Sequence, residues 1–151
     1  MKKKHYRDYA TDAFRILALY GSSEKYKERI IRECREASSD LGTKIDHGVS
    51  SPTEAEVIRA QDALDEKIST IADLEAAERA LEILKARFGE DAVKAVKICY
   101  MMDPHKPLAW KEIQTSVIFA VMNLHMSERT VYRYLSFARK SFAVERGLRT
   151  E

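Results

Sequence analysis

Residues 54–88 form the segment that most restricts how this chain can fold. Apolar side chains recur through it at steps of three, four and seven residues, which is the spacing of one face of an α-helix. The positions are Val57, Leu64, Ile68, Ile71, Leu74, Ala77, Leu81, Leu84 and Phe88. A single helix of this length would be ~50 Å long, more than a small domain can cover. The segment is therefore expected to pair with a second copy of the chain or with helices of its own chain.

The apolar stripe of this segment slips once around the helix. Ile71, Leu74 and Ala77 follow one another at two successive steps of three, which a continuous stripe does not do. The segment is either one long helix with a locally overwound turn or two helices that meet near residues 70–73. A break there would be supported by the polar residues Ser69, Thr70 and Asp73. We favour a homodimer through residues 54–88, and the alternative is a helical hairpin within one chain.

The remaining segments repeat the helical pattern. Gly and Pro are scarce, at five and three residues, which is too few for a turn-rich β-sandwich or barrel, and no segment alternates with period two. We predict an all-α helical bundle with a long central helix or helical hairpin and a C-terminal helix-turn-helix. The further helices are expected over residues 8–20, 24–37, 90–102, 108–124 and 127–146, with stops at Gly21, Gly89 and Gly147.

Three regions follow from this pattern. Ser, Gly, Asp and Pro collect in residues 38–53, which form the clearest linker. The prolines of Asp103-Pro104-His105-Lys106-Pro107 prevent a helix from continuing into the next one. The sequence is thus divided into an N-terminal helical module (1–45), a long helical and dimerising region (46–103), and a C-terminal pair of helices (104–151).

Charge is distributed unevenly, although the net charge is only +2. Residues 1–40 carry ten Lys and Arg against seven Asp and Glu. Residues 41–91 carry six against twelve, and residues 92–151 carry ten against five. The middle is acidic and both ends are basic, so a local surface for nucleic acid is compatible with a nearly neutral total.

Several chemistries lack a sequence signal. Cys34 and Cys99 belong to no CxxC motif, and the four histidines are not spaced as ligands, so we expect a reduced protein without a structural metal. The acidic residues of the long segment are expected to form a solvated face. No Gly-rich phosphate loop, nucleophile elbow or HExxH motif is present, and we expect neither an enzyme nor a cofactor. The basic start MKKKHYRDYA is followed by no apolar stretch, which indicates a cytoplasmic protein without a membrane segment.

The last two predicted helices are joined by a very short turn at His125 and Met126. Ser127 is placed to cap the second helix. Apolar residues at steps of four, three and four would dock that helix on the preceding one: Val131, Leu135, Ala138 and Phe142. The opposite side carries Glu128, Arg129, Tyr132, Arg133, Ser136 and Lys140, with Arg139 near the edge. This is typical of a helix-turn-helix, whose second helix enters the major groove of DNA. The alternative is an ordinary solvated amphipathic helix.

The residues from Ser127 to Lys140 resemble the recognition helix of sigma factor region four. That motif reads S-x-x-T-V-x-x-x-L-x-x-A-R, and the chain matches it at Ser127, Thr130, Val131, Leu135, Ala138 and Arg139. Residues 50–147 also resemble phage transcriptional regulators of the RinA/ArpU type. The shared features are Ser51-Pro52-Thr53 before a long acidic helix, Tyr100 closing a helix, and Trp110 and Ile113 ahead of the last two helices.

The resemblance implies a phage or prophage regulator that binds double-stranded promoter DNA in a bacterial host cell, with RNA polymerase as a second partner. The DNA-contacting residues would be Ser127, Glu128, Arg129, Thr130, Tyr132, Arg133, Ser136, Arg139 and Lys140. One departure stands out. Region four has an E-I-A triplet eight residues before the Ser, where this chain has Phe119-Ala120-Val121. The phosphate contacts of the first helix in region four therefore do not carry over directly.

Two other functions fit parts of the pattern. The acidic, coiled-coil-like segment 54–88 would suit a protein–protein adaptor that contacts RNA polymerase. A DNA-packaging subunit of the small terminase type also joins a helix-turn-helix to an oligomerising helical part. Trp110 could stack on a base, but core packing between helices is the expectation for it.

Overall fold

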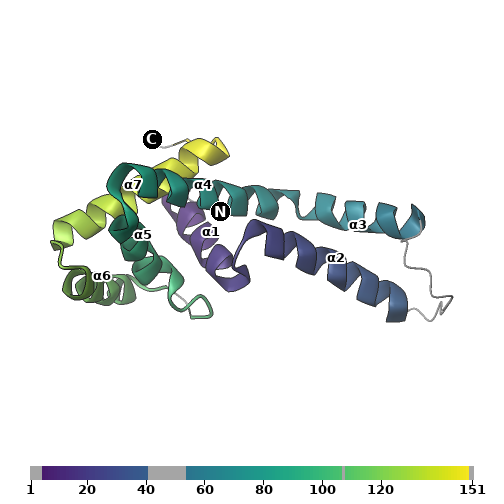
Figure 1. Ribbon diagram of the computed structural model, residues 1–151, viewed down its shortest axis with the longest axis horizontal. Coiled ribbons are helices and arrows are strands. Elements are labelled where there is room, and N and C mark those ends of the chain that lie inside the picture. The colour runs from purple at the N-terminus through teal and green to yellow at the C-terminus, as the bar shows by residue number, and fades with distance from the viewer. Residues whose placement is uncertain (1–4, 41–53, 107, 150–151) are drawn as a thin grey trace.

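Every element of the protein is helical in the part of the chain that the structure describes. The computed structural model describes residues 5–40, 54–106 and 108–149. The elements are α1 (Tyr6–Tyr20), α2 (Ser23–Asp40), α3 (Glu54–Glu66), α4 (Ile68–Phe88), α5 (Glu90–Val96), the π-helical turn η1 (Lys97–Met101), α6 (Trp110–Leu124) and α7 (Glu128–Arg146) (Figure 1). No strand occurs in these ranges, which confirms the all-α prediction. Most of the predicted linker, with Ser51-Pro52-Thr53, lies outside the described residues.

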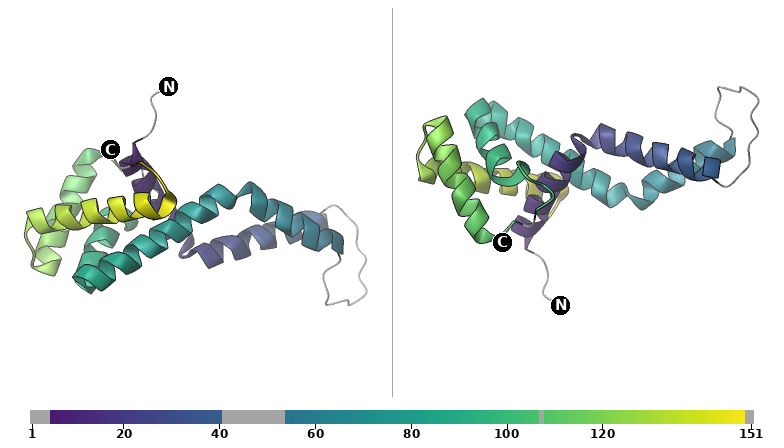
Figure 2. Two further views of the ribbon diagram at one scale, coloured as in Figure 1. Left: turned by 90° about the horizontal axis from the view of Figure 1, so that it is seen from above. Right: turned by 90° about the horizontal axis from the view of Figure 1, so that it is seen from below.

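The molecule consists of a helical body and an arm. α2 and α3 lie side by side and extend away from the body formed by the other helices (Figure 1, Figure 2). α3 has no buried residue, because it packs only against α2 and the start of α4. Among residues 23–36 of α2, whose burial the structure describes, only Ser23, Tyr26 and Ile30 are buried, near the body.

Segment 54–88 is two helices, and the break lies at Lys67. This corrects the predicted position, residues 70–73. Ser69 and Asp73 do not interrupt the backbone of α4. Both instead bind Arg146 of α7, whose Nε lies 2.6 Å from Asp73 Oδ1 and whose Nη2 donates to Ser69 Oγ over 3.1 Å. These two polar side chains bind a helix that is distant in the sequence. A sequence pattern cannot distinguish polar residues with this role from polar residues that end a helix.

The predicted apolar stripe is buried or half-buried from Ile71 to Phe88, but its earlier positions Val57 and Ile68 are exposed. Ile71, Leu74 and Leu84 are 8%, 0% and 0% exposed, whereas Val57 is 53% and Ile68 is 65% exposed. The prediction of an apolar packing position was therefore wrong for Val57 and Ile68. The apolar side of residues 71–88 packs into the core of its own chain. A homodimer through residues 54–88 stays a prediction, and it now concerns the outer faces of this segment.

An aromatic cluster forms the centre of the core. Phe14, Tyr100 and Phe142 come from α1, η1 and α7 and are at most 1% exposed. The ring centroid of Phe14 lies 6.2 Å from that of Tyr100 and 6.2 Å from that of Phe142. The small residues Ala76, Ala77 and Ala80 line the buried side of α4, where α1 and α7 pack against it. The core thus draws on residues from all three predicted regions.

Most helix ends follow local sequence signals. Gly21, Gly89 and Gly147 have φ angles of 91°, 96° and 75°, which favour glycine, and each follows a helix as predicted. The short helix after Gly89 differs from the prediction, because its last turn is the π-helical η1. None of the described helices is long and apolar enough to cross a membrane.

Candidate nucleic-acid interface

α6 and α7 are joined by a tight turn that fixes where α7 begins. His125, directly after α6, adopts a left-handed conformation with φ 54° and ψ 45°. Ser127 is extended and caps α7, because its Oγ accepts a hydrogen bond from the backbone N–H of Thr130 over 3.2 Å. The two side-chain hydroxyls are also hydrogen-bonded to each other, over 2.8 Å. The predicted cap is confirmed, and Ser127 and Thr130 act together to hold the start of α7.

We expect the variant Ser127→Ala to lose about 1 kcal/mol of unfolding free energy, because a helix-capping side chain is removed. Chemical denaturation followed by circular dichroism would measure the loss. Ser136→Ala is the matched control, since Ser136 lies inside the same helix. Equal stability of Ser127→Ala and the wild-type protein would contradict the capping role.

The predicted docking face of α7 is buried. Val131, Leu135, Ala138 and Phe142 are all 0–1% exposed. Through them, α7 packs more extensively against α4, α5 and α1 than against α6. The docking face predicted from the sequence is confirmed, but the main support of α7 is α4, because α7 packs along that helix over most of its length.

The opposite side of α7 presents a row of basic residues to solvent. Arg129, Arg133 and Lys140 are exposed, and the half-buried Ser136 lies between them at helical steps of four, three and four. We call Arg129, Arg133, Ser136 and Lys140 the α7 row. Arg129 and Lys140 form no hydrogen bond or ion pair with the described part of the chain. Their charges are thus available to a partner. Glu128 is exposed and Tyr132 half-buried, on the flank of the row.

Arg133 is held in place by an aromatic ring from another helix. Its guanidinium carbon lies 5.3 Å from the ring centroid of Phe88, the last residue of α4. The Arg87 guanidinium lies 5.6 Å from the same ring and 5.2 Å from that of Phe137. Cations near ring faces are attracted to them, so Phe88 brings Arg87 next to Arg133 of the α7 row. The sequence analysis missed Arg87, because only the packing of α4 on α7 brings it there.

Arg139 points elsewhere. Its Nη1 donates a hydrogen bond to the hydroxyl oxygen of Tyr100 over 2.9 Å, in a part-buried position. Burial raises the pKa of Tyr100, and the positive charge of Arg139 acts in the opposite direction. Arg139 therefore links α7 to η1 and lies outside the α7 row. The sequence pattern had predicted it at the edge of the DNA-contacting side.

Trp110 is the clearest error of the sequence analysis in this region. It was expected in the core, yet it is 61% exposed at the first residue of α6. Exposure is set by which helices cover a face, and only Val117 and Ala120 of α6 are fully buried.

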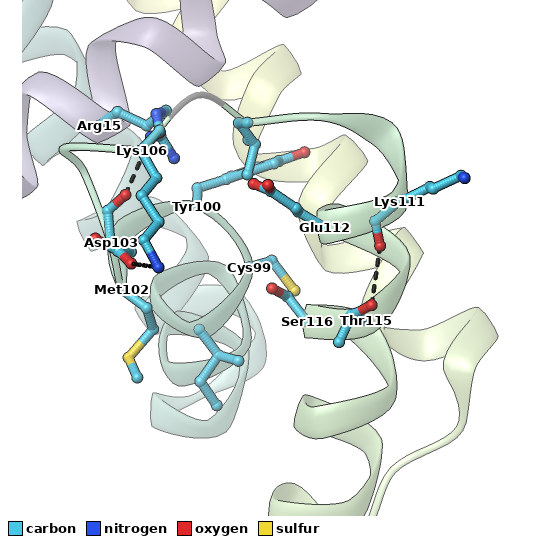
Figure 3. Close-up of a pocket in the computed structure, with 12 residues that line it drawn as sticks. Arg15, Cys99, Tyr100, Met102, Asp103, Lys106, Lys111, Glu112, Thr115 and Ser116 are labelled. Atoms are coloured by element: carbon cyan, nitrogen blue, oxygen red, sulfur yellow. Dashed lines mark hydrogen bonds and ion pairs between the residues drawn. The ribbon is translucent and has the colours of Figure 1, made fainter.

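A cavity of about 390 Å³ lies between α1, η1 and α6 (Figure 3). Three of its charged residues, Arg15, Asp103 and Lys106, are tied together by hydrogen bonds and an ion pair. Arg15 donates to the backbone oxygens of Asp103 and Lys106, and Lys106 Nζ lies 3.3 Å from a carboxylate oxygen of Asp103. Burial raises the pKa of the Cys99 thiol to about 12, so it is protonated at neutral pH and a poor nucleophile. No group of three metal-ligating side chains occurs among the described residues.

No protein-family model, curated protein or solved structure matches the chain. The functional interpretation therefore rests on the geometry of α6 and α7 and on the motif resemblance in the sequence.

Proposed function

We propose that the protein is a sequence-specific DNA-binding transcriptional regulator of a phage or prophage, and that α7 is its recognition helix. The observation that carries this proposal is the α7 row. Three cations lie on the solvent side of a capped helix whose opposite face is completely packed. A rigid helix with basic residues on its free side is the form in which proteins read the major groove.

The side chains of the row suit different parts of a duplex. Arg129 and Arg133 lie one turn apart near the N-terminal end of α7, where a recognition helix contacts base edges. Arginine can donate two hydrogen bonds to the O6 and N7 atoms of guanine. Lys140 lies about 10 Å further along the helix, and with Arg87 it would meet phosphates of the DNA backbone. We assign Glu128 to contact with bases, and Tyr132 and Ser136 to contact with bases or phosphates.

The other proposed partners follow from the same reading. The protein would act in the cytoplasm of the bacterial host and contact RNA polymerase at the promoter. A homodimer through residues 54–88 stays a prediction for the exposed side of α3, and a dimer formed through another helix would replace it. These partners are proposals, and the DNA-binding role does not depend on them.

The arm favours a second candidate function, an adaptor that contacts RNA polymerase. α3 has no buried residue, is mostly exposed, and carries five Asp and Glu against one Arg. A pull-down from host lysate after nuclease treatment separates the two functions. Retained polymerase would support the adaptor, whereas its complete loss would indicate that DNA bridges the two proteins.

Selection of bound sites from random duplex DNA, repeated at two salt concentrations, tests the proposed function. We expect one sequence motif to be enriched at both concentrations. Affinity should fall as salt rises, because phosphate contacts release counterions. Salt-dependent binding without an enriched motif would indicate contact with phosphates only and would contradict sequence-specific recognition.

A further inference from the structure

The outward face of α6 carries large apolar side chains that nothing in the described chain covers. Trp110, Ile118 and Met122 are 61%, 57% and 70% exposed, and Phe119 beside them is 50% exposed. Trp110, Gln114, Ile118 and Met122 follow one another at steps of four, which places them along one side of the helix. We call Trp110, Ile118, Phe119 and Met122 the α6 patch. The neighbours of α6, which are α5, η1 and α7, contact its other side.

The α6 patch is large for a surface without a partner. A large side chain exposes roughly 200 Å² when free, so the four exposed fractions amount to about 480 Å². Single exposed apolar residues are common, but an area of about 480 Å² is in the range of the largest apolar patch of a monomer, which often has a function. The exposed apolar residues of the arm are fewer, with Val57 and Ile58 at 53%.

We propose that the α6 patch binds the α6 patch of a second copy of the chain, with the two helices antiparallel. The area supports this occupant, because two copies would bury about 1,000 Å² from these four side chains alone, which is the minimum of a specific interface. The face is also self-complementary. In an antiparallel pair centred between Gln114 and Ile118, Trp110 of each copy meets Met122 of the other.

The absence of charged residues along most of α6 supports a second copy of the chain as the partner. Residues 113–124 contain no Asp, Glu, Lys or Arg, so two copies can meet without repulsion and without burying an unpaired charge. The charged residues Lys111 and Glu112 lie at the N-terminal end of α6, and an antiparallel pair places them at opposite ends of the interface. A charged partner would find no complementary group along this face. A two-fold contact between identical patches also closes at two copies.

This dimer differs from the one predicted through residues 54–88, and it does not depend on the proposed DNA binding. None of the α7 row residues belongs to the α6 patch. Should both inferences hold, the dimer would present two α7 helices to DNA, as two-fold symmetric regulators do on paired half-sites.

Sedimentation equilibrium of the full chain without DNA tests the proposal, at concentrations from about 1 to 200 µM. We expect the wild-type protein to reach twice the mass of the chain. The double variant Ile118→Glu with Met122→Glu should raise the dimer dissociation constant at least about 100-fold, since each change occurs twice in the interface. Gln114→Glu, which alters only an exposed polar side chain, should weaken the dimer in the same direction.

The matched control is the double variant Val57→Glu with Ile58→Glu, which adds the same charge to equally exposed apolar residues of α3. It should remain dimeric, and circular dichroism should show equal helix content in all variants. The proposal is overturned by a wild-type monomer at the highest concentration, by a larger ring, or by α6 variants that stay dimeric. Dissociation by the α3 control alone would instead place the dimer in residues 54–88. Because no DNA is present, none of these results bears on the proposed function.

Discussion

The variant Phe142→Ala is expected to lose about 3–5 kcal/mol of unfolding free energy, the usual cost of removing a fully buried aromatic side chain. Phe142 is 0% exposed and lies where α7 packs on the body. Its ring faces Phe14 of α1, which in turn stacks on Tyr100 of η1, so the substitution opens a cavity where three elements meet. A small domain has only about 5–15 kcal/mol of stability in total, so this loss would be visible as a large fall in the denaturation midpoint.

Urea denaturation monitored by circular dichroism would measure the loss. Val144→Ala is the control, since Val144 lies two residues further along the same helix and is 71% exposed. Its stability should stay within about 0.5 kcal/mol of wild type. A loss below 1 kcal/mol for Phe142→Ala would mean that α7 is not docked on this core as described.

Local signals in the sequence were enough to predict where α7 begins, where it ends and which side it buries. The signals are the cap Ser127, the stop Gly147 and the apolar spacing from Val131 to Phe142. All of them act within one helix, so the local sequence determines its limits and its buried side. The same holds for Gly21 and Gly89, where a left-handed backbone after a helix favours glycine.

Features that depend on contacts between distant residues could not be predicted. Arg139 was placed at the edge of the DNA-contacting side, but Tyr100, 39 residues earlier, accepts its hydrogen bond. Asp73 looked like a helix breaker and is the partner of Arg146. Trp110 is apolar enough for a core, yet no helix covers it. In each case the fold decides which distant segment packs beside the residue, or, for Trp110, that none does in the described part of the chain.

The candidate site was predicted in part for the same reason. The row Arg129, Arg133, Ser136 and Lys140 follows from helical geometry alone. Arg87 does not, because it reaches the row only through the packing of Phe88 against Tyr134 and Phe137, with ring centroids 5.1 Å and 5.0 Å apart.

The double variant Arg129→Ala with Arg133→Ala is expected to have the largest effect on DNA binding. Each lost base contact costs about 1–3 kcal/mol, so two would weaken specific binding by a factor between about 30 and 20,000. Stability should change little, because Arg129 has no intramolecular partner in the described chain and the ring contact of Arg133 with Phe88 is worth only about 0.5–1 kcal/mol. Discrimination between the selected duplex and a scrambled one should fall together with affinity.

A control must separate base recognition from the loss of two positive charges. Arg32 and Arg35 of α2 are both exposed and lie on the arm, away from α7 (Figure 1). The double variant Arg32→Ala with Arg35→Ala therefore changes the net charge equally. Its affinity for the selected duplex should stay within about threefold of wild type, because distant exposed charges are largely screened by salt.

Fluorescence anisotropy titration of the selected duplex at one fixed salt concentration, with wild type and both double variants, tests most directly whether α7 reads DNA. We predict that Arg129→Ala with Arg133→Ala weakens binding at least about 30-fold while the arm control binds like wild type. Equal affinity of that α7 variant and wild type, or equal losses in both double variants, would contradict the assignment of α7 as the recognition helix.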